Sequence, residues 1–164
     1  MARGQLLDLA EDLARVCAAV DVLFLVNDHL DIALLSGADG VHLGPDDLSV
    51  AAARRVAGPS LLIGASASTA DAGRAAQAAG ANYLGSGPAY STPVKTQKRV
   101  IGPRGVAAVA AAVDLPVFAI GGVELDRIPE LREAGVARVC AIRSLAEAAD
   151  PEAEARRFRE ALIA

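Results

Sequence analysis

The feature that most constrains the fold of this chain is a regular alternation of short apolar runs with longer alanine-rich stretches. The apolar runs are five to seven residues long and rich in Val, Leu and Ile. Such runs are typical of parallel strands that are buried on both faces. Their alternation with helical stretches predicts a parallel sheet with crossover helices. We expect strands at 22–26, 40–44, 61–66, 83–87, 116–122 and 138–144, and helices at 28–36, 49–57, 69–79, 103–112, 125–134 and 151–163.

The number of strand–helix units limits how the sheet can close. An eight-stranded β/α barrel needs eight units and typically about 250 residues. This chain has 164 residues and six units after an initial helix. That length suits a single domain spanning residues 1–164. The sheet is therefore open, or its edge is covered by the first helix or by another chain, because unpaired edges favour association. A homo-oligomer that covers the edge is one expectation.

Composition argues against several classes of partner. The net charge is −4, so the chain lacks the basic face that nucleic-acid binding needs. No apolar run reaches the roughly 18 residues of a membrane span. The first residues are amphipathic and carry acids, unlike an export signal. The two cysteines show neither metal-binding spacing nor a disulfide pattern. We therefore expect a cytoplasmic protein with small-molecule substrates and no contact with membranes.

Acidic residues follow the first two predicted strands. Asn27-Asp28 ends one of these strands, and Asp46-Asp47 comes shortly after the next. Function in parallel β/α sheets lies at the carboxyl ends of the strands. Mg²⁺ prefers one or two carboxylates together with phosphate oxygens of a substrate, so these acids are candidate magnesium ligands. They are also typical helix-capping residues: Asp28 before the helix near His29, and Asp46 or Asp47 before the helix after Leu48. The two interpretations are compatible.

The remaining polar strand ends indicate phosphate binding. Gly121-Gly122 follows one strand, and Ile142-Arg143-Ser144 comes one unit later. Barrels of this kind bind phosphate with main-chain N–H groups at these two positions. Arg143 would add a charge-assisted contact. Lys95 fits an electrostatic contact with a second phosphate group better than a Schiff base, which needs a desolvated pocket. Hydroxyls at the same sheet edge could help to bind it: Ser66, Ser68 and Thr92. We interpret His29 and His42 as structural.

Five of these segments together resemble a known family. They are "LFLVNDHLDIALLSGADGVHLGPDDL", "LIGASAS", "YLGSGPAYSTPVK", "PVFAIGGV" and "RVCAIRSL". In order and spacing they are similar to thiamine phosphate synthase and the related thiazole tautomerase, from about Val22 to the end. The resemblance implies a TIM-barrel (β/α) fold, here incomplete, with about six parallel strands and without the family's first two β/α units. It also implies an enzyme of thiamine biosynthesis, a transferase that joins hydroxymethylpyrimidine pyrophosphate to thiazole phosphate, releases pyrophosphate and uses Mg²⁺.

The resemblance also implies roles for individual residues. Asp28 and Asp47 match the magnesium ligands, and Asn27 matches a pyrophosphate contact. Ser66 matches a serine near the pyrimidine, and Lys95 matches a lysine that contacts the pyrophosphate. Ser66 and Lys95 are the candidate catalytic residues. The substrate-binding candidates are Asn27, Ser66, Thr92, Lys95, Gly122, Ile142 and Arg143. In this chemistry the leaving pyrophosphate departs from a pyrimidine methyl cation, so charge neutralisation and positioning carry the reaction and no side-chain nucleophile is needed.

The chain departs from the family pattern at several positions. Val94 replaces the second threonine of a "TPTK" motif, Ser68 replaces a histidine that acts as a base in the tautomerase, and Arg143 replaces a common serine. The early Gln-x-Arg-x-Lys strand has no counterpart. Three hypotheses therefore stand: an active synthase, a thiazole-phosphate-binding relative of tautomerase-like or regulatory function, and a catalytically degenerate fragment.

Overall fold

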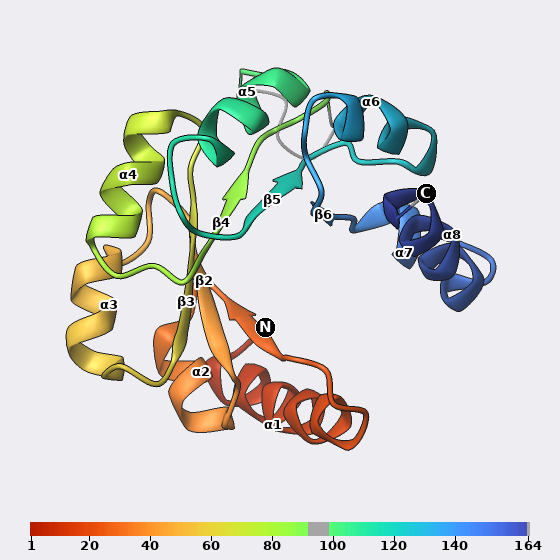
Figure 1. Cartoon of the computed structure of the whole chain (residues 1–164). Helices are drawn as coiled ribbons and strands as arrows, with labels where there is room; N and C mark the ends of the chain where they lie inside the picture. The colour runs from red at the N-terminus through yellow and green to blue at the C-terminus, as the bar shows by residue number, and fades with distance from the viewer. Residues whose placement is uncertain (92–98, 164) are drawn as a thin grey trace. The chain divides into compact units, whose positions relative to one another are not determined.

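The computed structural model describes residues 1–91 and 99–163, and in these ranges six strands alternate with helices along the chain (Figure 1). The strands are β1 (Leu25–Asn27), β2 (Gly40–Leu43), β3 (Leu62–Ser66), β4 (Tyr83–Ser86), β5 (Val117–Ile120) and β6 (Val139–Cys140). The helices are α1 (Arg3–Ala19), α2 (Leu30–Ser36), α3 (Val50–Ala57), α4 (Ala70–Ala78), α5 (Gly102–Ala110), the 3-10 turn η2 (Leu125–Arg127), α6 (Ile128–Glu133), α7 (Arg143–Ala146) and α8 (Pro151–Ile163). Every predicted strand and helix is present, most with shorter bounds; α8 has the predicted bounds, α5 begins one residue earlier, and β1 ends one residue later.

The contacts of the chain fall into two compact units. Unit 1 comprises Met1–Ser66 and Ala76–Asn82, and unit 2 comprises Ala67–Ala75 and Tyr83–Ala164. In unit 1, β1, β2 and β3 pair in parallel in sequence order. In unit 2, β4, β5 and β6 do the same. The expected parallel pairing of sequential strands is therefore confirmed within each unit, whereas the single domain stays a prediction.

The aliphatic core of unit 1 lies between its strands and helices α2 and α3. Val41, Leu43 and Ile63 on the strands are at most 2% exposed. Helices α2 and α3 contact β2 and β3, and each contributes an alanine with no exposed surface, Ala33 and Ala53. Because side chains alternate across a strand, His42, between Val41 and Leu43, points to the opposite face of the sheet. The apolar residues thus fix which side chains this unit presents away from its helices.

Unit 2 is built in the same way, around α4, α5 and β4. A Cβ atom on Gly73 of α4 would lie 3.3 Å from Val109 of α5 and 3.4 Å from Leu84 of β4, so the small residue lets the three elements pack closely. On β4 and β5, Tyr83 and Phe118 meet edge to face with ring centroids 5.7 Å apart. Helix α8 packs on η2, α6 and α7. None of the described helices is long and apolar enough to cross a bilayer.

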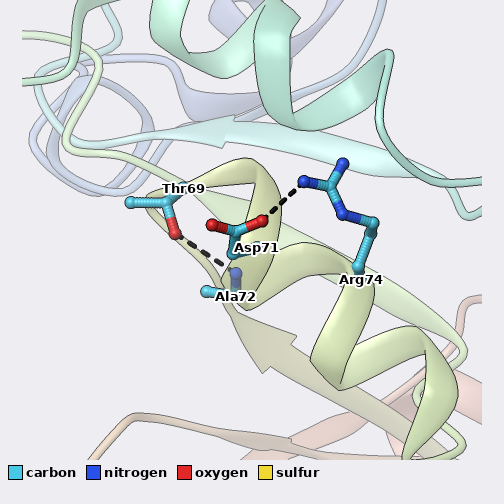
Figure 2. Close-up of polar contacts among 4 residues, drawn as sticks. All are labelled: Thr69, Asp71, Ala72 and Arg74. Carbon is cyan, nitrogen blue, oxygen red and sulfur yellow. Dashed lines mark hydrogen bonds and ion pairs between the residues drawn. The ribbon is translucent and has the colours of Figure 1, made fainter.

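Helix α4 begins with a side-chain cap. The Oγ1 atom of Thr69 accepts a hydrogen bond from the N–H of Ala72 at 3.2 Å, and Asp71 pairs with Arg74 one turn further on (Figure 2). A threonine cap satisfies one of the N–H groups that a helix start leaves without a partner. The start of the helix predicted at 69–79 is therefore fixed by sequence-local contacts.

One predicted element is wrong in its second half. The strand expected at 138–144 ends at Cys140, and Arg143 begins the short helix α7. Strand β6 pairs with β5 through only two residues, Val139 and Cys140. Ser144 instead uses its hydroxyl to donate to the carbonyl of Val123 at 3.0 Å. An apolar run alone does not distinguish a strand from a strand followed by a helical turn.

A single arginine joins three segments of unit 1. The guanidinium of Arg54 in α3 donates four hydrogen bonds of 2.6–2.9 Å, to the carbonyls of Gly58, Leu61 and Gly80 and to the side-chain oxygen of Asn82. The same Asn82 oxygen accepts from the N–H of Ile63 in β3 at 2.8 Å. The end of α3, the start of β3 and residues 76–82 are therefore held by one charged group.

We expect Arg54→Met to lower the free energy of unfolding by about 2–3 kcal/mol, because half-buried carbonyls lose a charged donor. Urea denaturation followed by circular dichroism measures this loss. Arg55→Met is the matched control, since Arg55 is the next residue of α3 and is exposed, and it should change stability by less than about 0.5 kcal/mol. Equal effects of the two substitutions would contradict the structural role of Arg54.

Candidate functional site

The first element of the site is a tight turn at the end of β1. Asp28 has a φ of 68°, and the N–H of His29 donates to the carbonyl of Asn27 at 2.9 Å. This bond over two residues, with a positive φ between, defines a γ-turn, which is rare and strained. The N–H of Asp28 also donates to the carbonyl of His42 in β2 at 2.8 Å. Strain of this kind is concentrated at functional sites, and here it occurs at a predicted magnesium ligand.

The second element is the loop after β2, which brings Asp47 to Asp28. The Asp47 carboxylate accepts from the N–H of Gly44 at 2.7 Å, which folds the loop back on the strand end. Loss of solvation, then a hydrogen bond and charge repulsion from Asp47, raise the pKa of the Asp28 carboxyl above its ordinary value. The two acids therefore lie close together, whereas their role as magnesium ligands stays a prediction.

The chemistry of the paired carboxyls suits the magnesium ion predicted from the sequence, which stays a prediction. No group of three or more His, Cys, Asp or Glu side chains that could hold a metal occurs among the described residues. Two carboxylates are, however, what Mg²⁺ takes from proteins when phosphate oxygens and water complete its shell. Loss of solvation is the main cause of the raised Asp28 pKa, and a divalent cation held by Asp28 and Asp47 would offset the charge repulsion that adds to it.

Helix capping does not account for these acids. The cap of α3 is Ser49, whose side chain accepts from the N–H of Ala52 at 3.2 Å. Helix α2 begins after His29, which makes no side-chain cap bond. The capping interpretation of Asp28, Asp46 and Asp47 is therefore wrong, because Ser49 caps α3 and the N-cap residue of α2 is His29.

Ser66 lies at the end of β3, exposed, and in contact with a residue that sequence reasoning missed. The Nε2 atom of His42 is 3.1 Å from the Ser66 hydroxyl. His42 pairs with Asn27 on one side and with Gly64 on the other, so Asn27, His42 and Ser66 lie on the same face of the three strands. Our structural interpretation of His42 overlooked this. The signal was present, because His42 alternates with buried Val41 and Leu43 and must face the other way.

In unit 2 the residues after β5 are covered by the segment that follows β4. The N–H groups of Ala89 and Tyr90 donate to the carbonyls of Ile120 and Gly121 at 2.8 and 2.9 Å. Gly122 has a φ of 64°, and a Cβ atom there would lie 2.6 Å from the carbonyl oxygen of Ser91. Glycine is thus required by both the backbone conformation and the close approach. The main chain of Gly122 packs against the main chain of Ser91. Such a main-chain arrangement is compatible with an anion site built from N–H groups.

Ile142 and Arg143 follow β6, and the chain there contacts the residues that follow β5. Ile142 is 65% exposed and directly precedes α7, and Arg143 is the first residue of that helix. The bond from Ser144 to the Val123 carbonyl joins the start of α7 to the residue after Gly122. The three phosphate-binding candidates of unit 2, Gly122, Ile142 and Arg143, are therefore neighbours, although their roles stay predictions.

The site residues predicted from sequence thus fall into two groups. Asn27, Asp28, Asp47 and Ser66 are at strand ends of unit 1, and Gly122, Ile142 and Arg143 are at strand ends of unit 2. Thr92 and Lys95 lie outside the described residues. Both groups are at the carboxyl ends of parallel strands, the functional end of β/α proteins.

A solved structure has the same architecture over nearly the whole chain. Thiamine phosphate pyrophosphorylase from Pyrococcus furiosus matches 99% of this chain with a TM-score of 0.91 and 32% sequence identity, and the match covers 78% of that protein. The chain is therefore a β/α protein of the TIM-barrel type, as the sequence predicted, with six parallel strands in its described part.

Sequence comparison identifies the family. The profile described as thiamine monophosphate synthase matches residues 1–145. A thiamine-phosphate synthase of Salinispora arenicola is 48% identical over 159 residues, which are 96% of this chain and 76% of that protein. A thiamine biosynthesis bifunctional protein of Symbiobacterium thermophilum is 47% identical over 92% of this chain, but the match spans only 32% of its length. This chain belongs to the thiamine monophosphate synthase family.

We expect Asp28→Asn to stabilise the chain at neutral pH in the absence of metal, by about 0.5 kcal/mol, because Asp28 is exposed and solvent screens its repulsion from the half-buried Asp47. The pKa of Asp28 is raised in the folded state, so its ionisation lowers the free energy of unfolding above that pKa. The gain should therefore shrink as the pH falls from 7 to about 4, because the carboxyl becomes protonated in the folded chain as the pH falls through its raised pKa. Asparagine tolerates the left-handed backbone as well as aspartate. Urea denaturation at pH 7 and pH 4 measures both effects.

Asp46→Asn is the control for this prediction, because Asp46 is exposed in the same loop and does not contribute to the pKa shift of Asp28. It should leave stability unchanged at both pH values. A loss of stability in Asp28→Asn at pH 7 would mean that the two carboxyls do not repel each other in the folded chain.

Proposed function

We propose that this chain is a thiamine-phosphate synthase, a transferase that joins hydroxymethylpyrimidine pyrophosphate to thiazole phosphate in thiamine biosynthesis. Membership of the family and the names of relatives at 47–48% identity support this activity. The observation that carries it is the strained turn that brings Asp28 against Asp47 at the ends of two adjacent strands. That pair is suited to a cation bound to a leaving pyrophosphate.

The residues of unit 1 act on the pyrimidine substrate. Asp28 and Asp47 would hold Mg²⁺, which neutralises charge on the departing pyrophosphate when it is bound. Asn27 offers its side-chain amide to the pyrophosphate, and Ser66, aligned by His42 at 3.1 Å, contacts the pyrimidine. Bond cleavage needs only charge stabilisation and positioning, which these groups supply.

The residues of unit 2 hold the second substrate. The N–H groups of Gly122 and Ile142 bind the thiazole phosphate, and Arg143 adds a charged donor. Family resemblance assigns Thr92 to the thiazole side and Lys95 to the pyrophosphate. Once pyrophosphate has left, the thiazole nitrogen attacks the pyrimidine methyl cation, which forms the new C–N bond with no protein nucleophile.

We also propose that the protein is a cytoplasmic homo-oligomer. Leu9, Leu13 and Val16 of α1, with the C-cap residue Val20, are 41–66% exposed and recur at spacings of four, three and four residues, which aligns them in one stripe along the helix. Val22 and Leu23, just before β1, are 55% and 63% exposed. An apolar surface of this kind marks an interaction site, and we assign a second copy of this chain to it.

The activity test is formation of thiamine phosphate by the purified 164-residue chain from hydroxymethylpyrimidine pyrophosphate, thiazole phosphate and Mg²⁺. We expect turnover that requires Mg²⁺ and falls at least about 100-fold in Asp47→Ala, because one of two metal ligands is lost. Asp46→Ala, in the same loop, should retain turnover.

Absence of turnover in a folded wild-type chain would reject the synthase. Binding of thiazole phosphate without turnover would then favour the thiazole-phosphate-binding relative. If no substrate or product binds, the degenerate fragment is the remaining hypothesis.

The oligomer is tested by sedimentation velocity at micromolar concentration. We expect a dimer or larger species for the wild type, and a monomer for the double substitution Leu13→Asp and Val16→Asp, because charges would be buried at the contact. Val56→Asp is the control, since Val56 is 67% exposed on α3, away from the stripe, and it should leave the oligomer intact. A monomeric wild type would contradict this assignment.

A further inference from the structure

Tyr90 makes contacts at both ends that no sequence motif indicated. Its side chain is 7% exposed, and its hydroxyl donates to the Glu130 carboxylate of α6 at 2.9 Å. The guanidinium of Arg127 lies 4.5 Å from the centre of its ring, in the geometry of a cation–π contact. Its main-chain N–H donates to the carbonyl of Gly121 at 2.9 Å. Tyr90 therefore connects α6 with the main chain that follows β5.

Tyr90 makes this connection beside Gly122, a candidate phosphate-binding residue. A Cβ atom on Gly122 would lie 2.9 Å from the Tyr90 Cβ and 2.6 Å from the Ser91 carbonyl oxygen. The main chain at Gly121 and Gly122 therefore rests directly on Tyr90 and Ser91. Both glycines have positive φ values, 92° and 64°. Because glycine has no side chain, no side-chain contact of their own holds this conformation. Their geometry depends on what is packed against them.

We propose that Tyr90 is a positioning residue for the phosphate of the second substrate, acting through the main chain of Gly121 and Gly122. The inference rests on the proposed function. With Glu130 as acceptor, the hydroxyl anchors the segment to α6, and the ring and backbone of Tyr90 then fix where the Gly122 N–H points. An N–H that is fixed in advance binds an anion more tightly than one that must be ordered on binding.

The alternative is that Tyr90 is an ordinary core residue. A core position needs no hydroxyl, and burying one is unfavourable unless it is hydrogen-bonded. Here burial, followed by the bond to Glu130, raises the pKa of Tyr90 to about 12, so the phenol keeps its proton and donates throughout the physiological range. The two interpretations differ in what removal of the hydroxyl changes: stability alone, or affinity for one substrate.

The experiment compares Tyr90→Phe and Glu130→Leu with the wild type. Isothermal titration calorimetry gives the Kd for thiazole phosphate, and steady-state kinetics gives kcat and the KM of each substrate. We expect Kd and KM for thiazole phosphate to rise about 10-fold in both variants, the effect of one lost hydrogen bond to a charged group. The KM for the pyrimidine pyrophosphate and kcat should change less than about twofold, because Gly122 is proposed to bind the thiazole phosphate and not the pyrimidine substrate.

Two further variants separate positioning from general destabilisation. Glu130→Gln keeps an oxygen acceptor at the same place and should restore affinity to within about threefold of the wild type. Glu133→Leu removes an exposed acid from the same helix and should change neither constant. This pattern of rescue is not expected if Tyr90 only stabilises the fold.

The outcomes are decisive for the proposal. Unchanged Kd in Tyr90→Phe, or equal changes in the constants of both substrates, would overturn it, as would a wild-type chain that does not bind thiazole phosphate. A wild-type chain that binds thiazole phosphate without turnover would reject the synthase but not this inference, because the calorimetric comparison still measures the effect of the hydroxyl. The two failures are therefore distinguishable.

Discussion

The register of parallel strand pairing is the constraint on which the candidate site depends. Main-chain bonds place Asn27 opposite His42 and His42 opposite Gly64. Because side chains alternate along strands, this register puts Asn27, His42 and Ser66 on one face. A slip of one residue would turn a strand's polar side chains towards the helices. The buried residues that prevent the slip, Val41 and Leu43, are therefore as necessary for the site as the polar ones.

The γ-turn at Asp28 has two features that lower the stability of the chain. Asp28 adopts a left-handed backbone and lies against a second carboxyl, and each feature destabilises the chain without a ligand. The N–H of Asp28 is held by the His42 carbonyl, so the adjacent strand keeps the residue in this conformation. Two unfavourable features at one residue are typical of a functional site, and a bound cation would offset the repulsion between the carboxyls.

The sequence predicted the elements well because apolar runs and alanine-rich helices reflect burial, which is a local property. It predicted the grouping of Asp28 with Asp47 because parallel strands end at one edge. Two failures are local, because several polar residues before α3 could cap it and an apolar run does not show where a strand ends: Ser49 rather than an aspartate caps α3, and β6 stops at Cys140. The third depends on residues that are distant in sequence, since His42 of β2 reaches Ser66 of the adjacent strand β3. No window of sequence contains both partners of that last contact, although strand periodicity gives the direction in which His42 points.

The two groups of site residues differ in how they depend on side chains. In the proposed function the unit 1 group would contact the ligand through side chains, so each substitution should have its own chemical effect. The unit 2 group would act mainly through its backbone, since Gly122 and Ile142 are proposed to contribute N–H groups. A backbone site tolerates changes at its own positions wherever geometry allows, which is consistent with Arg143 in place of the family's serine. We expect such a site to be sensitive to loss of the hydrogen bonds that support its main chain, here from Tyr90 to Glu130 and from Ser144 to Val123. Specificity in such a site is therefore encoded in residues that never contact the ligand.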